Sequence, residues 1–395
     1  MDPLKSLFWV VLIAALAPLI VKILPGPRLP AVVFMLIGGI IIGPEMLARS
    51  SPDDMSLLST IGLSFLFLLA GYELDLGLMR QPAGRIALRS WFLSAALGLV
   101  VTALLYETGV INDFVAIAIG LTTTALGTLL PILREAGLMS SPLGPYVFAA
   151  GAVGEFLPIV AMALLLTSAG PIAGVFALVG MATATFIALW IIRFVKARQW
   201  GEKFMLAEES TGQNTLRWTL VLLAGLVLVA DDFGLDVVLG AFLAGVVLRQ
   251  WAPVSAESLE RKLEAVGYGV FIPIFFVTSG MKLDVVSIME NPLRLLLFFG
   301  LLFAVRGLPQ LLMYRRTLDI TQRWQMVLLT ATALPLLVAL ADVGTESGLM
   351  LPENAAALVG AGALSVVVFP LLATSLGRSG AQPDPVAAGS RDDSG

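Results

Sequence analysis

Long apolar segments recur along the whole chain, and they constrain its fold more than any other feature. Segments such as 4–24 and 353–376 are about 20 residues long, enough to cross the roughly 30 Å hydrocarbon core of a bilayer as α-helices. Hydrophobic residues make up 58% of the 395 residues and charged residues only 13%, whereas a soluble domain carries about 25% charge. Because backbone polar groups in lipid must pair internally, these segments predict an all-α polytopic membrane protein.

We predict thirteen transmembrane helices from the apolar segments. Their ranges are 4–24, 29–47, 56–78, 84–107, 112–135, 143–168, 171–196, 214–231, 235–251, 258–281, 293–315, 322–345 and 353–376. With the N-terminus outside and the C-terminus in the cytoplasm, most of the 24 basic residues fall on the cytoplasmic side, and only Lys5, Arg49, Lys282 and Arg294 lie outside. This asymmetry is the one that the positive-inside rule requires, so it supports both the count and the direction.

Two parts of the chain carry the same motifs in the same order. The stretch 67–75 (FLLAGYELD) matches 276–284 (FVTSGMKLD), with Phe, Gly, Leu and Asp in the same places. Further upstream, 29–40 (LPAVVFMLIGGI) matches 235–246 (LDVVLGAFLAGV). The chain therefore contains an internal repeat.

The span count predicts that the second repeat is inverted. The repeats occupy 4–168 and 214–376, and span 171–196 connects them. Matching spans are then an odd number apart and cross the membrane in opposite directions. Inverted repeats of this kind are the architecture of secondary transporters, which bind their ion near the midplane between the repeats.

Two ionisable residues lie near the centre of their spans. Glu155 is midway along 143–168 and Arg306 midway along 293–315, while Glu73 is less deep, near the inner end of 56–78. Charges inside a bilayer are costly and usually functional. A buried carboxylate needs a proton or a cation, and if only the loaded site can cross the barrier, one must be exchanged for the other. Glu155 is thus the predicted proton and monovalent-cation site, and Glu73 a weaker candidate. The alternative is that a Glu155–Arg306 ion pair only fixes packing.

Two threonine clusters supply further candidate ligands. Thr122, Thr123 and Thr124 lie at mid-depth of one span and precede Pro131; Thr330 and Thr332 hold the matching place in the second repeat and precede Pro335. Proline removes a backbone donor, and hydroxyl oxygens can satisfy freed backbone groups or coordinate a cation. Broken helices are tolerated in a membrane where they line a cavity. We therefore predict two discontinuous helices here; packing of small residues is the alternative.

The chain resembles the cation:proton antiporter superfamily, in particular the monovalent cation:proton antiporter-2 branch with its sodium/hydrogen exchanger domain. The most specific motifs are 29–44, 65–75, 239–245 and 275–280, and the resemblance runs over about 5–378. It implies thirteen helices and a homodimer in a bacterial inner membrane. It also implies that a core, here 84–168 and 293–376, moves against a dimerisation domain, and that helices 112–135 and 322–345 cross at the ion site. A disordered tail is expected at 379–395.

The sequence departs from the family at the ion site. The family carries Asp-Asp, Asn-Asp or Gln-Asp where this chain has Gly154-Glu155, and many electrogenic members have lysine where Arg306 stands. Arg306 either reaches Glu155 or is held by helix ends. One titratable carboxylate beside a permanent cation predicts electroneutral exchange of a proton for Na⁺ or K⁺.

Three other functions compete with this prediction. A Na⁺-coupled organic-anion symporter is disfavoured, because the spans hold no further buried basic residue for an anion. A degenerate antiporter could serve as a sensor or subunit. A membrane enzyme is disfavoured by the absence of histidine and cysteine, and neither a cofactor nor nucleic acid is expected as a partner.

Overall fold

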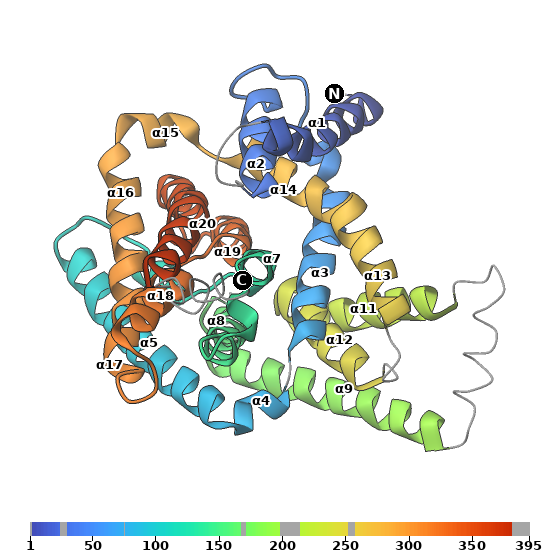
Figure 1. Ribbon diagram of the computed structural model, residues 1–395. Coiled ribbons are helices and arrows are strands. Elements are labelled where there is room, and N and C mark those ends of the chain that lie inside the picture. The colour runs from blue at the N-terminus through green and yellow to red at the C-terminus, as the bar shows by residue number, and fades with distance from the viewer. Residues whose placement is uncertain are drawn as a thin grey trace, which may run out of the picture.

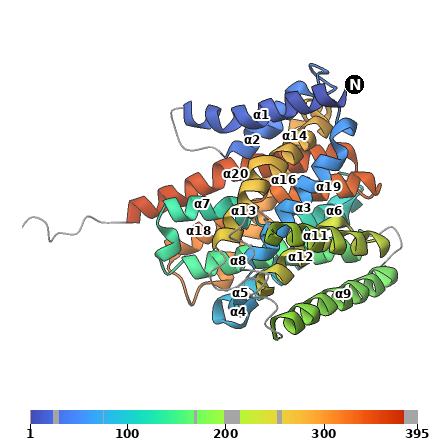
Figure 2. The same ribbon diagram turned by 90° about the vertical axis from the view of Figure 1, so that its right-hand side faces the viewer.

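The computed structural model describes residues 2–23, 30–74, 76–166, 171–197, 214–251 and 257–380, and helices account for the regular structure in these ranges (Figure 1). The helices are α1 (Pro3–Ile23), α2 (Ala31–Ile42), α3 (Ser56–Glu73), α4 (Leu76–Arg80), α5 (Pro82–Glu107), α6 (Phe114–Gly120), α7 (Leu126–Glu135), α8 (Gly144–Leu165), α9 (Pro171–Ala197), α11 (Asn214–Asp232), α12 (Val237–Trp251), α13 (Glu257–Val266), α14 (Ile272–Lys282), α15 (Val285–Glu290), α16 (Pro292–Leu301), α17 (Pro309–Met313), α18 (Ile320–Thr330), α19 (Pro335–Glu346) and α20 (Pro352–Gly380). Two π-helical turns, η3 (Gly267–Phe271) and η4 (Leu302–Gly307), join α13 to α14 and α16 to α17. In Figure 2 the start of α1 and the end of α20 lie at opposite ends of the bundle.

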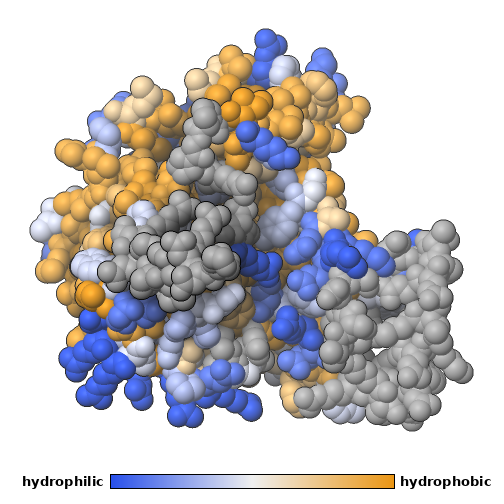
Figure 3. All heavy atoms as spheres, in the orientation of Figure 1, coloured by the Kyte–Doolittle hydropathy of each residue, from blue (hydrophilic) through white to orange (hydrophobic). Residues whose placement is uncertain are grey.

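Each predicted span overlaps one of these helices or a consecutive set of them. Within the described residues, nine helical stretches are long and apolar enough to cross a bilayer, and α2, α9 and α12 contain shorter apolar stretches. Large apolar side chains such as Phe8, Phe92 and Phe176 point outward from their helices. In Figure 3 hydrophobic residues dominate the left and upper edges, over α16 and α1, while hydrophilic residues gather at the lower left near α17. An apolar surface of this extent suits lipid rather than water.

Two predicted spans end earlier than the sequence suggested. The predicted span 29–47 stops as α2 at Ile42, because Gly43 precedes Pro44 and the residue before a proline avoids the α conformation. The predicted span 56–78 stops as α3 at Glu73, where Leu74 takes an extended conformation before the short helix α4. Of the predicted tail 379–395, the first two residues belong to α20 and 381–395 lie outside the described residues.

The helices pack in two groups. One group, here called the panel helices, consists of α1, α2, α3, α11, α12, α13 and α14; the other, here called the crossing helices, consists of α5, α6, α7, α8 and α16 to α20. Figure 1 shows the crossing helices on the left and in the centre and the panel helices above and to the right. Helix α9 packs on α8 from one group and on α11 and α12 from the other.

The repeated glycine motifs make matching close contacts among the panel helices. The most extensive helix pairs are α3 with α12 and α2 with α14. A Cβ atom on Gly71 would overlap the Phe242 carbonyl of α12, and one on Gly245 would overlap the Leu68 carbonyl of α3. Gly39 and Gly280 make the equivalent contacts between α2 and α14. Small residues let membrane helices approach this closely, and the same motif serves both repeats.

Gly245→Val is expected to destabilise the fold by roughly 1–3 kcal/mol, the usual cost of overfilling a packed interface. The added side chain would meet the backbone at Leu68 and Tyr72, which cannot rotate away as a side chain can. Thermal unfolding of purified protein in detergent measures the loss. Gly225→Val in α11 is the matched control, because a Cβ there has no neighbour within 4 Å. Equal losses in both variants would contradict the close approach of α12 and α3.

Candidate ion-exchange site

Two of the predicted spans are broken in the middle, and their non-helical segments meet. Residues 121–125 separate α6 from α7, and residues 331–334 separate α18 from α19. The Ala125 N–H donates to the Thr332 carbonyl at 2.8 Å, and the Thr124 hydroxyl donates to the Thr330 carbonyl at 2.7 Å. The breaks from the two repeats therefore hydrogen-bond directly to each other.

Local chemistry explains where each helix stops and restarts. Pro335 is the first residue of α19, where its missing N–H would have had no helical partner in any case. The hydroxyls of Thr122 and Thr123 donate to the carbonyls of Ile119 and Gly120, both at 2.7 Å, and so satisfy the last turn of α6. Pro131 lies inside α7 and does not mark the break.

The remaining predicted threonines also bond to backbone. Thr330 donates to the Met326 carbonyl at 2.7 Å and Thr332 to the Leu328 carbonyl at 3.1 Å, each one turn back in α18. A hydroxyl that donates to a carbonyl keeps its lone pairs, so it can still accept a bond or coordinate a cation.

Glu155 reaches the start of the second half-helix. It lies in α8, is 9% exposed, and its Oε1 accepts a hydrogen bond from the Leu126 N–H at 3.1 Å. Leu126 is the first residue of α7, whose preceding residue Ala125 offers no side-chain cap. The carboxylate thus occupies the positive end of a helix dipole and satisfies one of its free donors.

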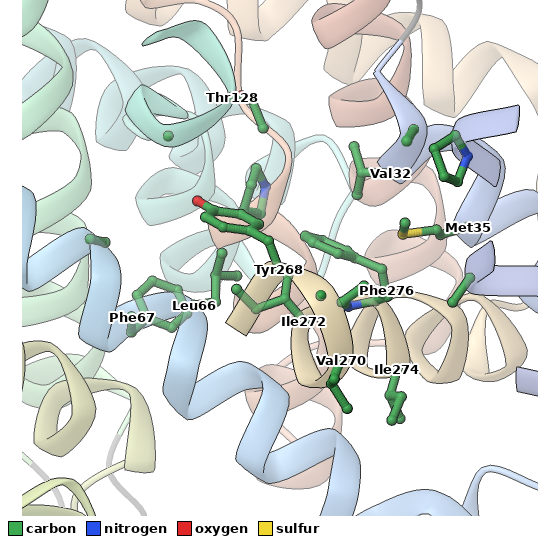
Figure 4. A pocket seen from close by; sticks show the side chains of 18 of the residues that line it. Val32, Met35, Leu66, Phe67, Thr128, Tyr268, Val270, Ile272, Ile274 and Phe276 are labelled. Carbon is green, nitrogen blue, oxygen red and sulfur yellow. The ribbon is translucent and has the colours of Figure 1, made fainter. Parts of the chain in front are cut away.

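A cavity of about 620 Å³ opens beside this carboxylate. Its walls are mainly apolar and come from both helix groups, including α1, α2, α3 and α14 on one side and α7 and α19 on the other. Figure 4 shows Val32, Met35, Leu66 and Phe276 among the lining side chains, with Thr128 of α7 across from them. The cavity connects Glu155 to the seam between panel and crossing helices.

Glu73 lines the same cavity at the end of α3. Its Oε2 atom is buried and has no hydrogen-bond partner. Charged groups close enough to interact with it include Glu260 and Glu264 of α13, Arg134, Arg249 and Glu155 itself. The structure therefore brings both predicted carboxylates to one cavity, although on opposite helix groups.

Arg306 is not among the residues that line the cavity. It sits in the π-turn η4 and is completely buried. Its Nε donates to Thr124 Oγ1 and its Nη2 donates to the Ala150 carbonyl, both at 2.9 Å, whereas its Nη1 has no partner. Within the part of the chain that the structure describes, no ion pair joins Arg306 to Glu155. Arg306 is therefore bonded to Thr124 in the break of the first repeat and to a carbonyl inside α8.

Gly154 leaves the space that Arg306 uses. A Cβ at this position would lie 2.6 Å from Thr124 Oγ1 and 2.7 Å from Arg306 Nη2. The Gly154 carbonyl also accepts the Thr124 N–H at 3.0 Å. The absence of a side chain at position 154 and the placement of Arg306 therefore depend on each other.

Helix dipoles explain why the two central charges stay apart. The guanidinium of Arg306 donates to Thr124, whose hydroxyl in turn donates a hydrogen bond to the Thr330 carbonyl at the end of α18. Positive charge thus stands near a negative helix end. Glu155 stands at the positive end of α7. Each charge is thus partly compensated by backbone of opposite polarity rather than by the other charge.

Tyr268 is a cavity residue that the sequence analysis missed. It belongs to the π-turn η3, and Figure 4 shows its ring reaching into the cavity. A Cβ on Gly127, in the first turn of α7, would lie 3.6 Å from the Tyr268 hydroxyl. A π-turn inside a helix is frequently a functional feature, and the stretch Gly267-Tyr268-Gly269 within an apolar span was the available signal.

Several known antiporter and efflux proteins are similar to this chain in sequence. The chain is 28% identical to a Na⁺/H⁺ antiporter of Enterococcus hirae over 68% of this chain and 71% of that protein. It is 30% identical to the glutathione-regulated potassium-efflux system protein KefC of Escherichia coli O139:H28, over 92% of this chain and 59% of KefC. It is 27% identical to cation/H⁺ antiporter 18 of Arabidopsis thaliana over 72% of this chain, but spans only 37% of that protein.

The fold itself is that of a solved antiporter. The sodium proton antiporter MjNhaP1 from Methanocaldococcus jannaschii superposes with a TM-score of 0.63 over 96% of this chain and 97% of that chain, at 16% identity. The family model of the transmembrane sodium/hydrogen exchanger matches residues 11–376. The chain therefore belongs to the transmembrane sodium/hydrogen exchanger family.

Proposed function

We propose that this protein exchanges protons for Na⁺ or K⁺ across a bacterial inner membrane, one for one, with Glu155 as the shared site. The proposal includes thirteen spans in two inverted repeats, a homodimer, an external N-terminus and a cytoplasmic C-terminus. The matching contacts of the repeated glycine motifs and the paired broken helices support the repeats. Relatives named as Na⁺/H⁺ antiporter and potassium-efflux protein support both cations as candidates.

The observation that carries the proposal is the position of Glu155. Its carboxylate is buried, faces a cavity and receives a backbone N–H, but no described basic side chain pairs with it. An ionised carboxylate in such a place is costly unless a cation joins it, and a proton removes the charge altogether. Proton and metal ion then compete for one site, and the loaded forms carry equal charge.

Alternating access follows if only a loaded site crosses between the two faces. The cavity opens between panel and crossing helices, so movement of one group against the other would close this opening and expose Glu155 elsewhere. Glu73 and Tyr268 lie on the panel side of the cavity and would meet the cation on its way to Glu155. The threonine hydroxyls at the crossing stabilise the two breaks through hydrogen bonds to backbone carbonyls, and their oxygen atoms are further candidate ligands for the cation. These residues are Thr122, Thr123, Thr124, Thr330 and Thr332.

Antiport in proteoliposomes with a clamped membrane potential tests the stoichiometry. We expect the rate and the final pH gradient to stay the same when the potential changes by 100 mV, for Na⁺ or for K⁺. A net charge moved per cycle would contribute about 2.3 kcal/mol per 100 mV, which is roughly a 40-fold shift in equilibrium. A set-point that follows the potential would contradict one-for-one exchange, and the absence of any cation-driven proton flux would favour a sensor or subunit.

A further inference from the structure

A single lysine ties the panel helices to the crossing helices at the end of the seam away from the cavity. Lys282 is the last residue of α14, and its Nζ lies 2.7 Å from Asp342 Oδ1 and 3.3 Å from Glu346 Oε1, both on α19. Both helices begin at the cavity, at Ile272 and Pro335. With a rise of 1.5 Å per residue, the ion-paired residues lie roughly 10–16 Å along the helices from these first residues.

The surroundings of this lysine hold more negative than positive charge. The charges of Asp342 and Glu346 also act on Asp236, which lies in the turn before α12. Two carboxylates, those of Asp342 and Glu346, therefore contact one ammonium group, and the side chain of Asp342 is only 19% exposed. A second cation would be needed to balance the cluster if Lys282 moved away.

A small cavity beside the ion pair carries several polar groups on an otherwise apolar lining. Its volume is about 160 Å³, and its walls include Ser279, Lys282, Asp342 and Thr345. Ser279 is 5% exposed and its Oγ has no hydrogen-bond partner. A buried hydroxyl without a partner is uncommon, and here it faces a cavity that also holds a carboxylate.

We propose that Asp342, Glu346 and Ser279 form a binding site for a monovalent cation at this end of the seam, and that Lys282 closes it in the conformation described. The ammonium group stands where the cation would stand and ties α14 to α19. When the two helix groups move apart, Lys282 leaves and a free cation takes its place on the route to Glu155. This inference rests on the proposed alternating access.

The test uses the fact that the chain contains no cysteine. Ala355 lines the small cavity and is 5% exposed, so Ala355→Cys reports access to it. Labelling by a membrane-impermeant methanethiosulfonate is followed in reconstituted protein, with N-methyl-D-glucamine as the only cation. We expect Lys282→Gln to raise the labelling rate by about fivefold or more, as the loss of a partly buried ion pair would. Adding Na⁺ or K⁺ should then slow the labelling again, and Asp342→Asn in the Lys282→Gln protein should remove this protection.

Arg294→Gln is the matched control. It breaks the Arg294–Glu353 pair, 3.6 Å long, which joins α16 and α20 within the crossing helices and does not bridge the two groups. It should leave labelling unchanged, and Lys282→Arg should behave as the parent protein. An unchanged labelling rate in the Lys282→Gln protein would contradict the proposal that Lys282 closes the site. A faster rate that neither Na⁺ nor K⁺ slows would contradict the proposed cation site. Because labelling does not require exchange, its result is independent of the antiport assay, in which failure would count against the proposed function instead.

Discussion

Glu155→Gln is expected to abolish cation-driven proton flux, lowering it by at least about 100-fold, the lower end of the effect of removing a group that transfers a proton. Glutamine keeps the size of the side chain, and its carbonyl oxygen can still accept the Leu126 N–H that Oε1 accepts now. It can neither bind a proton near neutral pH nor neutralise a cation. Fluorescence-based antiport in liposomes, over a series of monovalent cations, measures the loss.

Glu73→Gln is the matched control for this experiment. It makes the same chemical change to a carboxylate in the same cavity, but on a panel helix rather than at the crossing. We expect reduced apparent affinity for the cation with exchange retained. Glu155→Asp should also retain exchange, since it keeps the charge. Full exchange in the Glu155→Gln protein would show that this residue does not carry the ions.

Arg306→Ala is expected to have the second large effect, this time on folding. Arg306 is completely buried, and its loss removes the charge-assisted bonds to Thr124 Oγ1 and to the Ala150 carbonyl. Such bonds contribute about 1.5–3 kcal/mol each, and the truncated side chain leaves a cavity as well. We expect a loss of roughly 3 kcal/mol or more, measured as a lower unfolding temperature in detergent.

Two further variants separate packing from charge at this place. Arg306→Lys keeps the positive charge but cannot form both bonds from one planar group, so it should fall between the parent and Arg306→Ala. Gly154→Ala places a Cβ against both Arg306 Nη2 and Thr124 and should also destabilise the parent. The loss should be smaller in an Arg306→Ala background, where only the contact with Thr124 remains. If the losses in stability caused by Gly154→Ala and Arg306→Ala were additive, the packing of Arg306 would not depend on the glycine at position 154.

The broken helices show which structural features a local sequence pattern predicts and which it does not. Threonines followed by proline predicted discontinuity in 112–135 and 322–345, and the breaks do fall at the two threonine clusters. Pro335 starts α19, but Pro131 lies within α7, where the break has already ended. In the second repeat, proline lowers the free-energy cost of interrupting the helix. In the first repeat, hydrogen bonds from Thr124 and Ala125 to the carbonyls of residues 330 and 332 stabilise the non-helical conformation. Those bonds depend on a segment that lies far away in the sequence.

The sequence alone was enough to predict a membrane protein, to find the paired motifs and to identify the family resemblance. Apolar segment length, glycine motifs and a carboxylate in an apolar span are local properties, and lipid leaves the backbone few other choices than helix. Tertiary structure decided the partners of the central charges: Arg306 beside Gly154 and Thr124, and Glu155 at the start of α7. It also decided that Tyr268 enters the cavity and that Lys282 meets Asp342. Each of these contacts joins residues from different helices, so their distance and direction are set by helix packing, which no single segment encodes.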